Sequence, residues 1–423
     1  MGHLPVPIGG AGNTAHECKG NSILRILKVV QAFYPFQEHG GPVVKVRALA
    51  RGLALRGHHI TVLSADLGLE KRGGHDMKVE RCKWGWRSEQ DGVEAIYLST
   101  VSRRRALTIN PRVIGFCRAS LREYDVVHFY GLYDLLGPQV SLACRRLEIP
   151  YVIEPMGMFR PIVRNLLLKR MYHRVLGKSF VGGARFLIAT SYLEKQELIE
   201  GSIPSSRVVV RRNGVDVPDR LPERGEFRRR LDIRPNAKIV LFLGRLVSKK
   251  SPDILIEAFA RWRDKSSHSI DSVLVLAGPT EGDGFVSRLK KMANQLGLGE
   301  STRFVGPLYD EGKWQAYRDA DVFVLPSLNE NFGNTAAESA ACGTPVIVTD
   351  RCGIASFVGR AGLVVSHDRA QIELALGQLL DDPHLRERYQ AGCAEMVQAL
   401  AWTSPIRENE ALYEQCLEKV SAV

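Results

Sequence analysis

The sequence lacks several features that would place it in other protein classes. Its eight cysteines include no Cys-x-x-Cys pair, so neither a disulfide framework nor a zinc site is indicated. Its apolar runs are no longer than a β-strand, so no helix is predicted to cross a membrane. Residues 1–20 are rich in Gly and Pro, without the basic and apolar segments of a signal peptide. We therefore expect a cytoplasmic protein with a flexible tail over residues 1–20.

The sequence also has no Gly-x-Gly-x-x-Gly fingerprint, no internal repeat and no low-complexity tract. Its 45% hydrophobic and 25% charged residues are typical of a soluble globular protein. At 423 residues it is too long for one ordinary core and suits two domains. The net charge of +12 favours an anionic partner, and a nucleotide sugar, an anionic lipid surface and a nucleic acid all fit.

The most informative stretch predicts a strand, a loop, a helix and a second strand. Val322–Leu325 is a short apolar run of the kind that a buried parallel strand needs. Asn334 is predicted to cap an Ala-rich helix, which Gly343 and Pro345 end. Val346–Thr349 is the next strand. In such a unit the loop after the first strand lies at the carboxyl edge of the sheet, beside a helix N-terminus that attracts phosphate.

Two glutamates frame this loop with seven residues between them. Glu330 lies in the loop and Glu338 one turn into the helix, so both can point into one crevice. Carboxylates only accept hydrogen bonds, which suits the hydroxyls of a sugar or a ribose. Taken alone, the two glutamates are explained equally well as solvated side chains.

A second motif follows the predicted strand Lys238–Leu243. Arg245 and Lys250 emerge from its carboxyl end, at the same rim as Glu330, and Ser251 is predicted to cap the next helix. Two fixed cations suit a diphosphate, because a guanidinium binds oxygens in a bidentate manner and an ammonium acts as a point charge. Without further context, surface solvation explains them as well.

The first half of the chain predicts another Rossmann-like unit. Ile23–Val30 is a strand, and Gly40 and Gly41 precede a predicted helix, where the absence of side chains lets backbone amides approach a phosphate. His128 and Tyr130 lie on one face of a later strand, because strand side chains alternate. A structural role for His128 is as good an explanation as an active one.

Together these motifs resemble the donor-binding region of the retaining, GT-B-fold glycosyltransferases known as group 1 or family 4. The likeness rests on Glu-x7-Glu with Phe-Gly after the first glutamate, on Gly-Thr-Pro-Val and on Gly-Arg-Leu-x-x-x-Lys. It implies an α/β fold of two Rossmann-like domains facing a cleft. We expect an acceptor-binding domain over residues 21–215, a nucleotide-sugar-binding domain over 216–398, and a C-terminal helix, 399–423, that packs back on the first domain.

The resemblance also implies roles for individual residues. Arg245 and Lys250 would bind the diphosphate and carry catalysis with Glu330, which would position the transferred sugar. Glu338 would contact the ribose. The other donor-binding positions are backbone or loop positions around the phosphates: Gly41, Phe332, Gly333, Asn334 and Thr335. Many relatives have His-x-His where this chain has His128 and Tyr130, so a sugar or acceptor contact is expected there, with Tyr130 in the place of a histidine.

The expected reaction transfers a sugar from a nucleoside diphosphate sugar to a hydroxyl acceptor with retention of anomeric configuration. We expect no metal and no cofactor. Asp319 and Asp321 have the Asp-x-Asp spacing of metal-dependent transferases of another fold, but they precede a strand of about six residues at about 3.3 Å each, which puts them roughly 20 Å below the rim.

Three further expectations concern partners. The acceptor is expected to be a lipid-linked or glycan precursor. The stretch 160–174 alternates basic and apolar residues at helical spacing, for which a charged face on a core helix is the default explanation and peripheral contact with an anionic membrane the alternative. The alternatives to transfer are a nucleotide-sugar 2-epimerase of the same fold and a basic nucleic-acid-binding protein, against which stands the absence of a recognised nucleic-acid motif.

Overall fold

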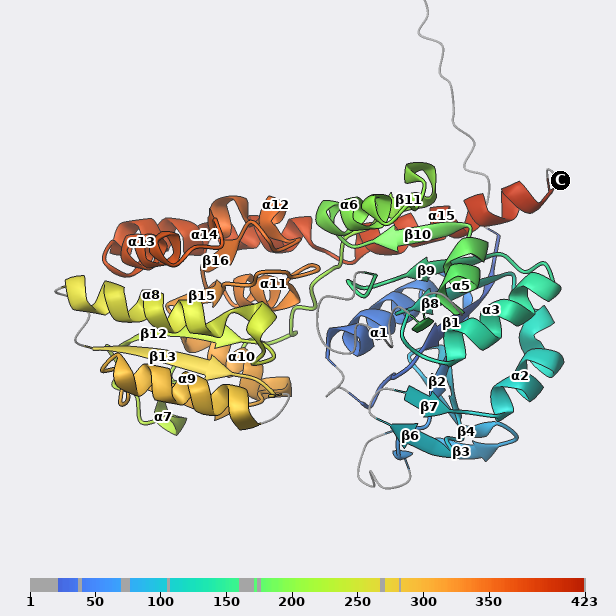
Figure 1. Cartoon of the computed structure of the whole chain (residues 1–423), viewed down its shortest axis with the longest axis horizontal. Helices are drawn as coiled ribbons and strands as arrows, with labels where there is room; N and C mark the ends of the chain where they lie inside the picture. Colours follow the sequence, from blue (N-terminus) through green and yellow to red (C-terminus); the bar gives the residue numbers. More distant parts are fainter. Residues whose placement is uncertain are drawn as a thin grey trace, which may run out of the picture.

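The computed structural model describes residues 22–36, 40–69, 77–104, 107–159, 171–172, 176–266, 271–280 and 283–421. The predicted N-terminal tail lies outside these residues. They form two lobes, each a largely parallel β-sheet covered by helices on both faces (Figure 1). The predicted α/β class, with two Rossmann-like units, is therefore confirmed.

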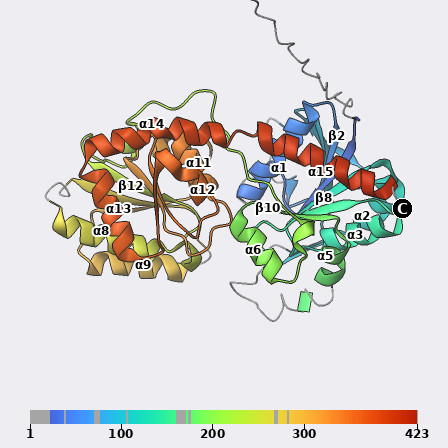
Figure 2. The same cartoon turned by 90° about the horizontal axis from the view of Figure 1, so that it is seen from above.

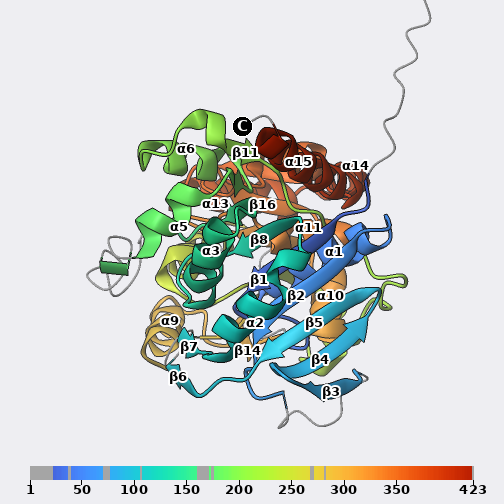
Figure 3. The ribbon, with the colours of Figure 1, turned by 90° about the vertical axis from the view of Figure 1, so that its right-hand side faces the viewer.

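The first lobe contains a nine-stranded sheet in the order β11-β10-β9-β8-β1-β2-β5-β4-β3. All neighbours are parallel except at β4, which is antiparallel to both β3 and β5. Figure 3 shows β3 and β4 at one edge of the sheet. Its strands are β1 (Arg25–Val30), β2 (His59–Ala65), β3 (Val79–Cys82), β4 (Gly85–Gln90), β5 (Val93–Leu98), β8 (Val126–Tyr130), β9 (Tyr151–Glu154), β10 (Phe186–Ala189) and β11 (Val208–Val210).

Helices bury both faces of this sheet, which is why its central strands read as continuous apolar runs. One face carries α1, together with α15 from the end of the chain, and the other carries α2, α3 and α5. A separate hairpin, β6 (Ser102–Arg104) and β7 (Leu107–Ile109), lies beside it. The helices are α1 (Gly41–Ala54), α2 (Arg112–Ser120), η3 (Leu121–Glu123), α3 (Leu136–Arg146), α5 (Lys178–Gly183), α6 (Tyr192–Glu200) and η5 (Ser205–Arg207).

The second lobe contains a six-stranded, wholly parallel sheet in the order β14-β13-β12-β15-β16-β17. Its strands are β12 (Lys238–Leu243), β13 (Ser272–Ala277), β14 (Thr302–Gly306), β15 (Val322–Leu325), β16 (Val346–Thr349) and β17 (Gly362–Val365). Its helices are α7 (Glu226–Arg230), η6 (Ser248–Lys250), α8 (Pro252–Lys265), α9 (Asp283–Gln295), α10 (Asp310–Asp319), α11 (Asn334–Ala341), α12 (Ala355–Val358), η7 (Gly359–Ala361), α13 (Arg369–Leu380) and α14 (Pro383–Ala399).

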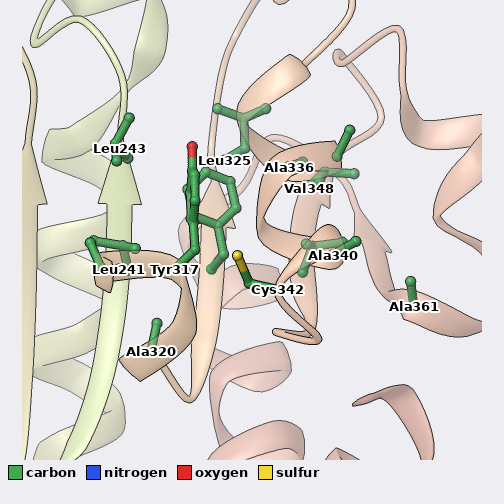
Figure 4. Packing of buried hydrophobic residues seen from close by; sticks show 14 of the residues in the cluster. Leu241, Leu243, Tyr317, Ala320, Leu325, Ala336, Ala340, Cys342, Val348 and Ala361 are labelled. Atoms are coloured by element: carbon green, nitrogen blue, oxygen red, sulfur yellow. The ribbon is translucent and has the colours of Figure 1, made fainter. Parts of the chain in front are cut away.

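One core of the second lobe lies between the sheet and α10 and α11 (Figure 4). Leu241 of β12 and Leu325 of β15 face Tyr317 and Ala340 from the two helices. Small residues on α11 let it lie close to the sheet, while Tyr317 fills the space beside it. This packing fixes the position of α11, and with it the loop that carries Glu330.

The chain crosses between the lobes twice. Val215 donates its amide to the carbonyl of Leu400, at 2.9 Å, and the indole of Trp402 donates to Asp216 Oδ1, at 2.7 Å. From there α15 (Thr403–Ser421) runs along the first lobe, in line with α14 (Figure 2). The two segments that connect the lobes are thus hydrogen-bonded to each other at the boundary between the lobes.

One predicted helix start is confirmed in position and another is wrong. Ser251 is the N-cap residue of α8 and Pro252 lies in its first turn, as predicted, but the Ser251 side chain makes no capping bond; the residue has a left-handed backbone, φ 50°, and its Oγ lies 2.9 Å from His367 Nε2. Asn334 is the first residue of α11 rather than its cap, a position that Gly333 takes with φ 115°. In both places the turn between strand and helix needs a positive φ, so backbone geometry, and not a capping side chain, sets the start of the helix.

Asp319 and Asp321 bind protein groups at the amino end of the second sheet. Asp319 accepts hydrogen bonds from the amides of Gly225 and Arg228, at 2.5 and 3.0 Å. Asp321 accepts from the amide of Ile239 at 2.8 Å and pairs with the Arg228 guanidinium at 3.1 Å. The two carboxylates thus anchor α7 to this edge. Across the described ranges, no group of three or more His, Cys, Asp or Glu side chains is arranged to hold a metal ion.

Candidate active site

The candidate site lies where loops at the carboxyl ends of the two sheets meet. A Cβ on Gly41, at the start of α1, would lie 3.2 Å from Asn334 Nδ2, and one on Gly157, after β9, would lie 3.0 Å from the Cβ of Asn331. Asn213 Nδ2 also donates to Asn334 Oδ1, at 3.0 Å. The N-terminus of α11 therefore faces the predicted glycine-rich loop of the first lobe, where a side chain at residue 41 would crowd it.

Lys250 and Glu330 form an ion pair at this rim. Their side chains are only 12% and 17% exposed, so the pair is largely shielded from water. Burial, with the positive charges of Lys249 and Arg245, lowers the pKa of Lys250 to about 7, while the Glu330 carboxylate favours the charged ammonium. Arg245 follows β12 and is exposed, close enough for its charge to act on Lys250. The structure thus brings Arg245, Lys250 and Glu330 together, and their catalytic roles stay predictions.

Backbone hydrogen bonds hold Glu330 in place. Its amide donates to the carbonyl of Arg351 at 3.0 Å, and its carbonyl accepts from the amide of Gly353 at 3.0 Å. A Cβ on Gly353 would come within 2.1 Å of the Asn331 carbonyl oxygen, so only glycine allows this pairing. The protein itself thus holds the backbone of this loop, which favours precise contacts to a substrate.

Four successive residues shape the start of α11. Phe332 is 3% exposed and packs into the core, so its ring does not line the site. Gly333 has φ 115°, and a Cβ there would lie 2.8 Å from the Cγ2 of Ile354. Asn334 and Thr335 line a cavity between the lobes. The first amides of a helix have no partner within it, so this terminus can accept an anion.

Glu338 lies one turn along α11 and lines the same cavity of about 600 Å³. Its Oε1 accepts from Lys313 Nζ at 2.8 Å and its Oε2 from the Tyr317 hydroxyl at 2.9 Å. Residues of α1, among them Arg47 and Arg51, form the facing wall. Both glutamates of the Glu-x7-Glu motif are therefore paired with a lysine. Lys313 and Tyr317 were not predicted, since each lies in an ordinary helical pattern far from the motif.

The structure places His128 and Tyr130 away from the cavity. Both are buried, their rings stack with centroids 4.1 Å apart, and they share a face as the strand periodicity predicts. His128 Nδ1 lies 2.6 Å from the Tyr413 hydroxyl of α15, and the Tyr130 hydroxyl accepts from Lys28 Nζ at 2.8 Å. Burial and neighbouring cations lower the pKa of His128 well below its usual value, so it is neutral. A sugar contact at either residue stays a prediction.

A second buried group of charges lies behind the rim of the first lobe. Glu154, at the end of β9, receives Lys45 of α1 on Oε1 and Arg211 on Oε2, the latter at 2.6 Å. All three side chains are at most 4% exposed. The two ion pairs tie the start of α1 to the end of β9 and to the segment that leads into Asn213.

The basic and apolar stretch 160–174, predicted to contact a membrane, lies outside the described residues except for Met171 and Tyr172. No helix within the described part of the chain has both the length and the apolar character needed to cross a bilayer.

Comparison with known sequences identifies the family. Residues 223–394 match the family described as glycosyl transferases group 1, and residues 40–214 match the glycosyl transferase 4-like domain. The D-inositol 3-phosphate glycosyltransferase of Thermomonospora curvata is 34% identical over 321 residues, covering 71% of this chain and 73% of that protein. The chain belongs to the group 1 glycosyl transferases. The predicted family is thereby confirmed, and the protein is a glycosyltransferase.

Other relatives and solved structures agree. The D-inositol 3-phosphate glycosyltransferase of Streptosporangium roseum is 36% identical over 297 residues, 67% of each chain. The sucrose-phosphate synthase of Thermosynechococcus elongatus has a TM-score of 0.70 at 20% identity, covering 94% of this glycosyltransferase and 100% of that chain. HepE of Anabaena, solved with UDP and glucose, has a TM-score of 0.70 at 18% identity and covers 95% and 100%. These likenesses show the GT-B fold.

Proposed function

We propose that this glycosyltransferase moves a sugar from a nucleoside diphosphate sugar to a hydroxyl acceptor, with retention of anomeric configuration. The observation that carries the proposal is the Lys250–Glu330 pair at the rim where Arg245 emerges, beside the N-terminus of α11. Cations and free amides suit a diphosphate, and an acceptor-only carboxylate suits sugar hydroxyls. The nearness of these cations, amides and carboxylate supports the proposal of a nucleotide-sugar site.

In this proposal the protein stabilises the leaving group. As the bond between the anomeric carbon and the diphosphate breaks, negative charge grows on the phosphate oxygens, and Arg245 and Lys250 offset it. Glu330 is ion-paired, so we assign it to holding the sugar and not to nucleophilic attack. Retention follows from attack on the same face that the diphosphate leaves, with a phosphate oxygen helping to deprotonate the acceptor. Glu338 binds the ribose.

The acceptor is proposed as a hydroxyl on a sugar or polyol. Two similar proteins are named for D-inositol 3-phosphate, and HepE was solved with UDP and glucose, which supports a UDP-sugar donor and a phosphorylated polyol as the first pair to test. A lipid-linked or glycan precursor acceptor at a membrane surface is the second candidate, because of the charge of +12.

Ligand-dependent melting tests the donor site. A nucleoside diphosphate at a hundred times its Kd stabilises a protein by about 2.7 kcal/mol, which raises the melting temperature of one lobe by roughly 5 to 10 °C. We expect such a shift with one of UDP, ADP and GDP. The corresponding sugars, incubated with inositol 3-phosphate and then with glycan acceptors, should yield a product whose anomeric configuration, read by NMR, matches the donor.

Three other outcomes of these experiments would contradict parts of the proposal. An inverted product refutes retention alone. An epimerised sugar formed without acceptor would favour the 2-epimerase. No shift with any nucleotide would refute the proposed donor site, and tight binding of RNA or DNA at physiological salt would instead assign the basic surface to nucleic acid.

A further inference from the structure

The carboxylate of Glu338 is held at both oxygens by one neighbouring helix. Lys313 Nζ donates to Oε1 at 2.8 Å, and the Tyr317 hydroxyl donates to Oε2 at 2.9 Å. Lys313 and Tyr317 are four residues apart on α10, so they lie on one face of it and reach the same carboxylate. The carboxylate is therefore clamped in one orientation.

Burial makes this clamp rigid. The Glu338 side chain is 15% exposed and that of Lys313 20%, while Tyr317 is fully buried. Lys313 Nζ also lies 4.5 Å from the ring centroid of Trp314, which restricts its freedom further. Burial and the charge of Glu338 raise the pKa of Tyr317 well above its usual value, so its hydroxyl keeps its proton and donates at every physiological pH.

The clamped carboxylate faces a space large enough for a nucleoside. Glu338, Thr335 and Lys313 line the cavity of about 600 Å³ between α1 and α10–α11. The cavity continues from Asn334, at the N-terminus of α11, where the diphosphate is proposed to bind. A ligand whose phosphates occupy that terminus would place its next unit, the ribose, beside Glu338.

The remaining hydrogen-bonding capacity matches a ribose. A carboxylate offers about four acceptor sites, and Lys313 and Tyr317 use two of them, one on each oxygen. One site per oxygen is left, which fits the two adjacent hydroxyls of a ribose. The ammonium of Lys313 also offsets a carboxylate charge that would otherwise repel the nearby diphosphate.

We infer that Lys313 and Tyr317 are positioning residues that orient Glu338 toward the two ribose hydroxyls of the donor and so make this site select ribonucleotides. The inference rests on the proposed function, because it takes a nucleoside diphosphate as the ligand of this cavity. It assigns a role in donor binding to Lys313, a residue outside the Glu-x7-Glu motif.

The test compares ribose with deoxyribose. Calorimetry measures the Kd of UDP, ADP and GDP, and of the 2′-deoxy form of whichever binds tightest, on wild-type protein and on Lys313→Met, Lys313→Arg and Tyr317→Phe. A hydrogen bond to a charged group is worth roughly tenfold to a hundredfold in affinity, so the wild type should prefer the ribonucleotide by about that ratio. Lys313→Met and Tyr317→Phe should each reduce the ratio several-fold, and Lys313→Arg should retain most of it.

A matched control breaks a lysine–glutamate pair outside the cavity. Lys265 pairs with Glu373 between α8 and α13, and its side chain is 68% exposed, so Lys265→Met should leave the ratio unchanged. The ratio of the two affinities reports how Glu338 is oriented toward the ribose, because a general loss of stability or of phosphate binding lowers the affinity for the ribonucleotide and for its 2′-deoxy form alike. Tyr317→Phe, which keeps the buried ring, serves if Lys313→Met does not fold.

Three results would overturn the inference. Wild-type protein that binds UDP, ADP or GDP without distinguishing its 2′-deoxy form leaves the proposed transfer standing but removes the role of Lys313 and Tyr317. The same follows if Lys313→Met and Tyr317→Phe both keep the wild-type ratio. If the wild type binds none of the three nucleotides, the proposed function fails, and the inference fails with it.

Discussion

Replacing Glu154 by Gln should destabilise the first lobe strongly, although the change keeps the shape of the side chain. Glu154 is fully buried between Lys45 of α1 and Arg211 at the end of β11. Gln removes the negative charge that the buried Lys45 ammonium and Arg211 guanidinium share. Burial and the charge of Arg211 already lower the pKa of Lys45 well below its usual value, so without Glu154 either a proton is lost from Lys45 or an unpaired cation stays buried. His128 Nε2, 3.7 Å from Glu154 Oε2, is neutral because its pKa is lowered, so it adds no further positive charge to the group.

The size of the effect follows from this burial. Breaking a buried ion pair by removing one partner costs about 3 to 5 kcal/mol, since the charge left behind stays out of water. An exposed pair is worth about 0 to 1 kcal/mol. Arg25 and Glu123 form such a pair on the same lobe, at 2.8 Å and with side chains 52% and 54% exposed. Glu123→Gln is therefore the matched control, with the same chemical change.

Urea-dependent hydrogen exchange can measure both variants. The amides of β8 and β9 report the free energy of opening of the first lobe separately from the second. Glu154→Gln should lower it by about 3 to 5 kcal/mol and Glu123→Gln by less than about 1. Adding Lys45→Met should cost much less in the Glu154→Gln background than in the wild type. Equal losses for the two glutamine variants would refute the reasoning.

Three further predictions concern charge at the site and in the core. Arg245→Ala and Lys250→Ala should each lower turnover by roughly a hundredfold or more, since removing one preorganised donor costs about 3 to 4 kcal/mol; wild-type turnover in steady-state assays would exclude their role. Because the pKa of Lys250 is lowered to about 7, this lysine is largely neutral at pH 8, and a bound diphosphate should favour its charged form, so that binding takes up protons. Calorimetry in buffers of different ionisation enthalpy measures this uptake, and Lys250→Met should abolish it. Burial also lowers the pKa of Lys28, so between that lowered pKa and the ordinary pKa of the unfolded state the unfolded chain binds more protons. The free energy of unfolding should therefore rise with pH toward 10, by at most about 1.4 kcal/mol per pH unit. Urea titrations at pH 7 to 9 measure this slope, and Lys28→Met should flatten it.

The second lobe could be predicted from sequence in some detail, because its motifs are local. The limits of β12, β15 and β16 agree with the predicted strands residue for residue. Each is a short apolar run ended by Gly, Pro or a charged turn, so neighbouring residues contain the information. The prediction that Arg245, Lys250 and Glu330 share one rim needed only the rule that parallel strands end at a common edge.

The wrong details arose where a local pattern allowed two solutions. Ser251 and Asn334 are both good capping residues, yet neither caps its helix with its side chain. The path of each turn decided this, since a positive φ was needed at Ser251 and at Gly333. The same applies to His128 and Tyr130. Periodicity gave their common face correctly but could not show that Tyr413 of α15 would cover it.

The sequence by itself determined the family, the α/β class and the loops that carry the candidate site, because each depends on residues adjacent in the chain. Only the tertiary structure decided how those residues are held. Lys313 and Tyr317 reach Glu338 from another helix, and Lys45 and Arg211 reach Glu154 across 109 and 57 positions of the chain. Pairs of this kind form only after the sheets and helices have packed, and no periodicity or spacing in the sequence encodes which charge will meet which.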